Sequence, residues 1–148
     1  IKMSIKVKII NQSNNPLPEY KTVGSSGMDV RAFTTEKISI RPLERVLIKT
    51  GLFLEMEIGM ECQVRPRSGL ALKQGLTVLN TPGTVDADYR GELGVILINL
   101  SNKEVFIENG ERIAQLVFAK IDSVDWLEVQ STEITDRGSG GFGSTGLK

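Results

Sequence analysis

The sequence contains no histidine, and its 148 residues include a single cysteine. Because histidine is absent, a Ser-His-Asp triad and a histidine-bound metal site are both excluded. A general base must therefore be a carboxylate, a lysine, a tyrosine or the thiol of Cys62. Cys62 alternates with Val64 in an apolar stretch, which indicates a core thiol rather than a nucleophile.

Neither sign of charge is in excess, since 18 basic and 18 acidic side chains give a formal net charge of zero. No global field recruits nucleic acid or an anionic membrane, and no apolar run approaches the ~20 residues of a membrane span. One cysteine cannot form an intramolecular disulfide, which fits a reducing, cytoplasmic setting. The chain opens on Ile1 with Met3 close behind and shows no signal-peptide pattern, so we expect trimming or addition at this end.

Helical periodicity is also missing, because no stretch of a dozen residues keeps a 3.6-residue period. Short alternating or wholly apolar runs separated by turn residues are typical of an all-β protein. Residues 68–73 are the one expected helical turn, with Ser68 as N-cap and Gly75 as stop. Strands are expected at residues 5–9, 28–33, 37–40, 45–56, 61–65, 95–98, 104–107 and 112–121, with breaks at Pro42, Gly51 and Gly59.

Two regions of the chain are expected to behave differently. Residues 1–130 are long enough to form one β-sandwich domain without disulfides or metal. Residues 131–148, here called the C-terminal tail, are polar and glycine-rich, and should be mobile unless a ligand orders them. The run at 95–98 is apolar on both faces, so it needs a second cover, which favours an oligomer.

The segment from Asn80 to Glu92 carries two carboxylates, a tyrosine and an arginine close to a turn. Thr81-Pro82-Gly83 is a turn signal, because proline presets one dihedral angle and glycine tolerates a positive φ. Apolar residues on both sides predict a β-hairpin with a polar tip. On this segment alone, a ligand-binding hairpin and an ordinary surface hairpin with solvated charges are both open.

Four further segments stand in a fixed order around it: Gly-Met-Asp-Val at 27–30, Arg-Ser-Gly-Leu-Ala at 67–71, Gly-Glu-Arg-Ile-Ala-Gln-Leu at 110–116, and the glycine-rich stretch at 137–146. Together the five segments closely resemble the trimeric dUTP pyrophosphatases (dUTPases), from about Gly24 to Thr145. The resemblance implies a jelly-roll-like β-sandwich with one short helix and a flexible tail. It also implies a homotrimer with active sites shared between subunits. Such an enzyme hydrolyses dUTP to dUMP and pyrophosphate with Mg²⁺. This reaction keeps uracil out of DNA and supplies dUMP for the synthesis of thymidylate.

The resemblance makes Asp86 the catalytic base. Hydrolysis of a phosphoanhydride needs a water held in line with the scissile bond, and a carboxylate can orient and deprotonate it. In the family this water attacks the α-phosphorus. If the segment is extended, Asp88 shares a face with Asp86 and is a rival, so only the motif register favours Asp86.

Three further positions in the segment are expected to recognise the uracil edge, namely Asn80 and the backbone groups of Gly83 and Val85. A site built for uracil leaves buried groups unpaired with cytosine, which can give on the order of 10⁴-fold discrimination. Thymine is excluded by lack of room for its methyl group. Tyr89 matches the family tyrosine that packs on deoxyribose and leaves no space for a 2′-hydroxyl, although a packing role alone is the alternative.

The triphosphate is expected to meet residues from three segments. Arg67, Ser68 and Gly69 open the helical turn, where free N–H groups favour phosphate. Gln115 is either a satisfied core amide or, as its motif position implies, a phosphate ligand, while Arg112 is expected to be structural. Asp29 is implied to reach Mg²⁺ through water, with the ion held mainly by phosphate oxygens.

The tail resembles a phosphate cradle, and no Gly-Lys-Ser/Thr sequence of a P-loop is present. Small residues, including Gly143, let backbone N–H groups approach an anion, while Arg137, Ser144 and Thr145 supply charge and hydroxyls. Phe142 matches the family phenylalanine that covers the uracil ring, so the tail is implied to be a lid. A flexible linker is the alternative.

Two rival functions remain at this stage. A dCTP deaminase shares the implied fold and much of the phosphate site, but that family carries a catalytic glutamate in the hairpin region and a second serine where Gly69 stands. A catalytically idle, nucleotide-sensing module on the same fold is the second rival. The presence of a candidate base, lid and phosphate ligands favours the hydrolase.

Overall fold

The computed structural model describes residues 4–146, so Ile1, Met3 and the last two residues of the C-terminal tail lie outside the described residues. Within that range the chain forms eleven β-strands and one short α-helix. In chain order they are β1 (Lys8–Asn11), β2 (Met28–Arg31), β3 (Ile38–Ile40), β4 (Arg45–Lys49), β5 (Leu52–Glu55), β6 (Met60–Arg65), α1 (Ser68–Gln74), β7 (Leu76–Val78), β8 (Gly83–Asp86), β9 (Gly94–Asn99), β10 (Val105–Ile107) and β11 (Arg112–Lys120).

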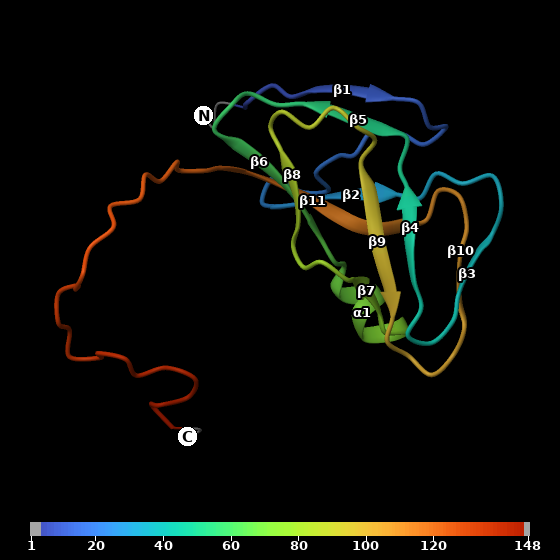
Figure 1. Cartoon of the computed structure of the whole chain (residues 1–148). Helices are drawn as coiled ribbons and strands as arrows, with labels where there is room; N and C mark the ends of the chain where they lie inside the picture. Colours follow the sequence, from blue (N-terminus) through green and yellow to red (C-terminus); the bar gives the residue numbers. More distant parts are fainter. Residues whose placement is uncertain (1–3, 147–148) are drawn as a thin grey trace.

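The strands form two larger sheets that face one another across a single hydrophobic core (Figure 1). One sheet has the order β2-β11-β6-β8 and the other β4-β9-β7, while β1-β5 and β10-β3 are two-stranded pairs. Alternate residues point into the core, such as Cys62 and Val64 on β6 and Val95 and Leu97 on β9. The expected all-β sandwich with one short helix is therefore confirmed.

Strand β9 is buried on one face only. Val95, Leu97 and Asn99 are fully buried, whereas Ile96 and Ile98 keep part of their surface exposed. The single chain thus leaves the second face of this apolar strand incompletely covered, and its cover by another subunit stays a prediction.

The predicted hairpin in the Asn80–Glu92 segment is wrong. Strand β7 pairs with β9, whereas β8 pairs with β6, so the two strands on either side of the turn belong to different sheets. The turn, with a cis Thr81–Pro82 bond, carries the chain from one sheet to the other. Leu76 and Val78 of β7 are buried beside β9, while the partly buried Val85 lies opposite Cys62, so each strand packs its apolar residues in a separate pairing.

The helix begins one residue earlier than a cap at Ser68 requires. Arg67 has the extended N-cap conformation, Ser68 is the first helical residue, and no side chain caps the helix, so the N-cap prediction is wrong. The stop is confirmed, because Gly75 has φ 64° in the left-handed region. The break at Gly51 is also confirmed, and the first strand lies at Lys8–Asn11 rather than at 5–9.

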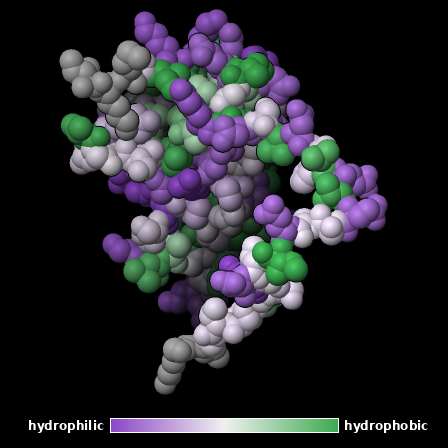
Figure 2. Space-filling view, turned by 90° about the vertical axis from the view of Figure 1, so that its left-hand side faces the viewer, coloured by the Kyte–Doolittle hydropathy of each residue, from purple (hydrophilic) through white to green (hydrophobic). Residues whose placement is uncertain are grey.

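After β11 the chain leaves the sandwich. Residues 121–146 contain no strand or helix, and in Figure 1 this part leads away from the body as a single trace. Hydrophobic side chains stand among hydrophilic ones on the part that projects from the body in Figure 2, and Trp126 is 95% exposed. No helix within residues 4–146 is long and apolar enough to cross a membrane.

Candidate active site

Three of the sequence motifs meet at Asp29 on β2. Its Oδ1 accepts a hydrogen bond from Arg67 Nε at 2.9 Å, and its Oδ2 accepts one from Arg112 Nη1 at 3.1 Å. Arg67 also donates from Nη1 to the backbone carbonyl of Arg112 at 3.2 Å. Two guanidinium groups around one carboxylate leave an excess positive charge, with N–H groups free to bind an anion.

Gln115 on β11 connects the same motifs on the other side. Its Nε2 donates to the Pro66 carbonyl at 3.0 Å, and a Cβ added to Gly27 would lie only 2.3 Å from its Oε1. Glycine at position 27 therefore leaves room for this amide in its observed position. Among residues 4–146, Gln115 Nε2 donates this one hydrogen bond, so its second hydrogen remains for another acceptor. The two roles predicted for Gln115, a satisfied core amide and a phosphate ligand, are therefore compatible.

Ser68 and Gly69 are the first residues of α1, and both are exposed beside Arg67. The first hydrogen bond at this end runs from Ala71 N to Arg67 O, at 3.1 Å. The N–H groups before Ala71 have no partner within the helix. The structure thus brings Arg67, which precedes Ser68 and Gly69, into contact with Asp29, and the role of these residues in phosphate binding stays a prediction.

A shallow cavity of about 400 Å³ joins this cluster to the turn of the Asn80–Glu92 segment. Gln63, Arg65 and Pro66 line it from one side, together with Gln115 and Pro82. Sequence reasoning missed Arg65. Its alternation with the buried Cys62 and Val64 is the signal that could have found it, because strand periodicity directs it to the outer face.

The Asn80–Glu92 segment holds its polar groups at the edge of the four-stranded sheet. Asp86 ends β8 opposite Glu61 and is exposed. Gly83 is buried, and a Cβ there would come within 3.2 Å of Asn80 Nδ2 and 3.3 Å of Val64 Cβ, so the Asn80 amide lies against its backbone. Val85 packs partly against the core, which directs its backbone along the β6 pairing.

Tyr89 lies three residues beyond Asp86 in the turn that follows β8. Its backbone N–H donates to the Asp86 carbonyl at 3.1 Å, and its hydroxyl donates to the Glu92 carbonyl at 3.1 Å. The side chain is about half exposed. The candidate base and the candidate sugar-contacting ring are therefore held in one short turn.

The Asp86 and Asp29 sites of a single chain are not in contact. Strands β2 and β8 form opposite edges of the four-stranded sheet, so strand spacing alone separates Asp29 and Asp86 by about 14 Å. Among residues 4–146, no hydrogen bond or ion pair joins Asp86 or Tyr89 to Asp29, Arg67 or Gln115.

The predicted site residues of the tail lie outside both groups. Arg137, Phe142, Gly143, Ser144 and Thr145 lack contact with the sandwich, since the hydrogen bonds of residues 131–146 all run within the tail, such as Arg137 Nε to Gly140 O at 2.9 Å. Phe142 is fully exposed, with φ 49°. Three groups of candidate residues thus exist in three separate places on one chain.

The residues around Asp29 do not form a protein-only metal site. Within residues 4–146, no group of three acidic, cysteine or histidine side chains is close enough to hold an ion. Both Asp29 oxygens already bind arginines, at 2.9 and 3.1 Å. This donor set fits only an ion that brings its own ligands, such as phosphate oxygens and waters.

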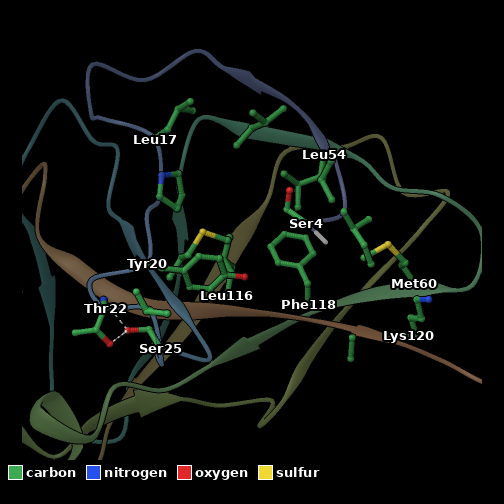
Figure 3. A pocket seen from close by; sticks show the side chains of 17 residues that line it. Ser4, Leu17, Tyr20, Thr22, Ser25, Leu54, Met60, Leu116, Phe118 and Lys120 are labelled. Atoms are coloured by element: carbon green, nitrogen blue, oxygen red, sulfur yellow. Dashed lines mark hydrogen bonds between the residues drawn. The ribbon is translucent and has the colours of Figure 1, made fainter. Parts of the chain in front are cut away.

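A second cavity, of about 570 Å³, has a different character (Figure 3). It lies between β1, the loop around Tyr20 and strand β11, and Leu116 and Phe118 point into it. Its lining is mostly apolar, so it does not suit a triphosphate. Among residues 4–146 it is an apolar groove that no other part of the chain covers.

The chain matches the family model described as dUTPase over residues 5–146. It is 59% identical to the deoxyuridine 5'-triphosphate nucleotidohydrolase of Aquifex aeolicus over 148 residues, with 99% of each chain covered. It is 53% identical to the protein of that name from Finegoldia magna, covering 96% of this chain and 99% of the other. The dUTPase of Staphylococcus bacteriophage 80alpha, a mutant solved with dUpNHpp, superposes with a TM-score of 0.87 at 25% identity, covering 97% of this chain and all of that one.

Proposed function

The chain belongs to the dUTPase family, and we propose that it hydrolyses dUTP to dUMP and pyrophosphate, which removes dUTP from the pool for DNA synthesis. The observation that carries this proposal is the joining of three motifs at Asp29, Arg67 and Gln115, beside the helix start at Ser68. This arrangement concentrates donors for a triphosphate. The similarity of relatives named as dUTP nucleotidohydrolases, over nearly the whole chain, supports it.

In the proposed reaction Asp86 is the base. Its exposed carboxylate orients a water in line with the bond between the α-phosphorus and the bridging oxygen, and accepts a proton as the water attacks. Pyrophosphate leaves from the opposite side. Asn80 and the backbone groups of Gly83 and Val85 bind the uracil edge, and Tyr89 packs on the deoxyribose.

The triphosphate binds where Arg67 and Gln115 keep unused donors and where Ser68 and Gly69 present exposed N–H groups. When Mg²⁺ is bound with the nucleotide, it neutralises phosphate charge. Asp29 reaches the ion through water, since its two oxygens also hold Arg67 and Arg112 in place.

A homotrimer with sites shared between subunits is part of the proposal. Asp86 and the Asp29 cluster lie at opposite edges of one sheet, so a substrate that touches both types of residue needs groups from two chains. The partly exposed face of β9 and the apolar groove are surfaces that such an assembly buries. Cyclic threefold closure repeats one arrangement at each interface.

The C-terminal tail is proposed to act as a lid of the same domain. Phe142 covers the uracil ring, while Arg137, Ser144, Thr145 and the backbone of Gly143 contact the phosphates. The support is that the tail is fully outside the sandwich and rich in small residues. It can therefore close over a ligand without breaking packed structure.

One assay tests the function. The purified protein is incubated with each deoxynucleoside triphosphate plus Mg²⁺, and the products are identified by chromatography. We expect dUMP and pyrophosphate from dUTP alone. Ammonia from dCTP would show a deaminase, and the absence of any product with intact nucleotide binding would show a sensing module.

A further inference from the structure

The ring of Tyr89 folds back over the chain that follows it. Its hydroxyl reaches the carbonyl of Glu92, three residues on, at 3.1 Å. To do so the ring crosses Gly91. A Cβ added at Gly91 would lie 2.3 Å from the hydroxyl oxygen, 2.5 Å from Cζ and 2.9 Å from Cε2 of Tyr89. Such distances do not occur between a Cβ and a neighbouring atom, so only glycine leaves room for the ring.

The backbone conformation at position 91 does not require glycine. Its φ is outside the left-handed region, in contrast to Gly51, which has φ 70°. An L-residue therefore fits the backbone at position 91 without strain. The space taken by Tyr89 is thus the specific reason for glycine at this position.

The acceptor of the Tyr89 hydroxyl is fixed to the sandwich. Glu92 Oε1 accepts the Gly51 N–H at 2.9 Å. The next residue, Leu93, is 2% exposed, and its N–H donates to the Leu52 carbonyl at 2.8 Å while its own carbonyl accepts the Thr50 hydroxyl at 2.6 Å. Glu92 is therefore held to residues 50–52 through its own carboxylate and through the residue that follows it.

We propose that Gly91 and Glu92 are positioning residues that seat the Tyr89 ring and thereby set the preference for deoxyribose over ribose. The inference rests on the proposed function, in which Tyr89 packs on the sugar. Discrimination against a 2′-hydroxyl is steric, so it requires the ring to stay in one place. Gly91 supplies the room, the Glu92 carbonyl holds the hydroxyl, and the Glu92 carboxylate ties both to the core.

The test measures kcat/KM for dUTP and for UTP and compares their ratio between variants. In Gly91→Ala the new methyl group displaces the ring, and we expect the dUTP:UTP ratio to fall about tenfold, within the range that one misfitting group gives in a pocket. Gly24→Ala is the matched control, because a Cβ there meets nothing within 4 Å and its φ is not positive. Its ratio should equal that of the unmodified protein.

A double-mutant cycle separates ring displacement from general damage. In a Tyr89→Ala background there is no ring to displace, so adding Gly91→Ala should change the ratio by less than about twofold. A folded Gly91→Ala protein whose ratio stays within about twofold of the unmodified protein, or an equal loss in both backgrounds, overturns the inference. If Gly91→Ala does not fold, the double variant Tyr89→Ala/Gly91→Ala should fold, because the ring that clashes with the new methyl group is gone. A double variant that also does not fold overturns the inference.

Fluorotyrosine labelling gives a readout besides activity. The chain has two tyrosines, so Tyr20→Phe leaves Tyr89 as the sole label. The ¹⁹F chemical shift of Tyr89 should change in Gly91→Ala and remain unchanged in Gly24→Ala. An unchanged chemical shift in Gly91→Ala contradicts the proposed position of the ring. If the unmodified protein releases no pyrophosphate from dUTP, the proposed function fails. The inference fails separately when dUTP is hydrolysed but neither the ratio nor the signal responds to Gly91.

Discussion

The Asn80–Glu92 segment and the C-terminal tail carry comparable chemistry but are held in opposite ways. The first pairs with β6, and its end is fixed by Glu92 and the buried Leu93. The tail has no hydrogen bond to the sandwich among its described residues, and its Phe142 is fully exposed. A base has to be positioned before the reaction, whereas a lid has to open for substrate exchange. In the proposed mechanism the comparison therefore separates a preorganised base from a lid that binding must order.

Replacing the base should have the largest effect. Asp86→Asn is expected to lower the rate of pyrophosphate release by about 10² to 10⁴, because the carboxylate acts mainly in the transition state. Affinity for a non-hydrolysable dUTP analogue should change by less than about tenfold. Asp88→Asn, on the same turn, is the control. A nearly normal Asp86→Asn protein alongside an inactive Asp88→Asn protein would assign the base role to Asp88.

The free energy of unfolding should depend on packing at the end of the Asn80–Glu92 segment and not on the C-terminal tail. Leu93→Ala removes a buried side chain at the end of the Asn80–Glu92 segment and should lower the free energy of unfolding by about 2 to 5 kcal/mol. Deleting residues 137–148 should change it by less than about 0.5 kcal/mol while abolishing efficient hydrolysis. Urea denaturation at one fixed protein concentration compares the two. A deletion as destabilising as Leu93→Ala would show that the tail packs on the sandwich.

Complementation tests whether the two regions of one site come from different chains. Asp86→Asn protein is refolded together with the tail deletion, both inactive alone. With random mixing, an intact base and an intact tail each have a probability of about one half, so roughly a quarter of the sites should work. Mass spectrometry confirms mixed trimers. If such trimers stay as inactive as their parents, each chain completes its own site.

Ordering of the tail should be visible as protection from a protease. Cleavage near Gly140 should be fast in the free protein and severalfold slower with a non-hydrolysable dUTP analogue and Mg²⁺. Cleavage within the Asn80–Glu92 segment should be slow in both states. Equal rates near Gly140 with and without ligand would rule out a ligand-ordered lid.

The smallest effect is expected for alkylation of Cys62, which lies opposite Val85, the residue before the proposed base Asp86. Burial raises the pKa of the Cys62 thiol to about 12. Since the folded pKa lies above the unfolded value of about 8.5, folding stability is fully present below pH 8.5 and declines as pH rises toward 12. Alkylation at pH 8 should be negligible in the full chain and in the tail deletion alike. Faster labelling of the deletion would mean that the tail covers this sheet.

Local sequence signals predicted several elements correctly. The alternating runs predicted an all-β chain, and the left-handed conformations of Gly75 and Gly51 end α1 and separate β4 from β5 as expected. Five ordered segments were enough to indicate the family. These features depend on dihedral preferences and on burial of one strand face, which are properties of neighbouring residues.

The N-cap at Ser68 and the bounds of the first strand were local errors, whereas the remaining failures were decisions between distant residues. A turn signal at Thr81–Gly83 predicts a turn but does not choose strand partners, and Val85, which pairs with Cys62 on β6, lies in another sheet from β7. The arginines that hold Asp29 are 38 and 83 residues away in the sequence. The reason for glycine at position 91 is a ring folded back over it. The sequence determined the strands and motifs, whereas side-chain burial across the folded sheets decided which groups meet, because those contacts exist only once distant strands pair.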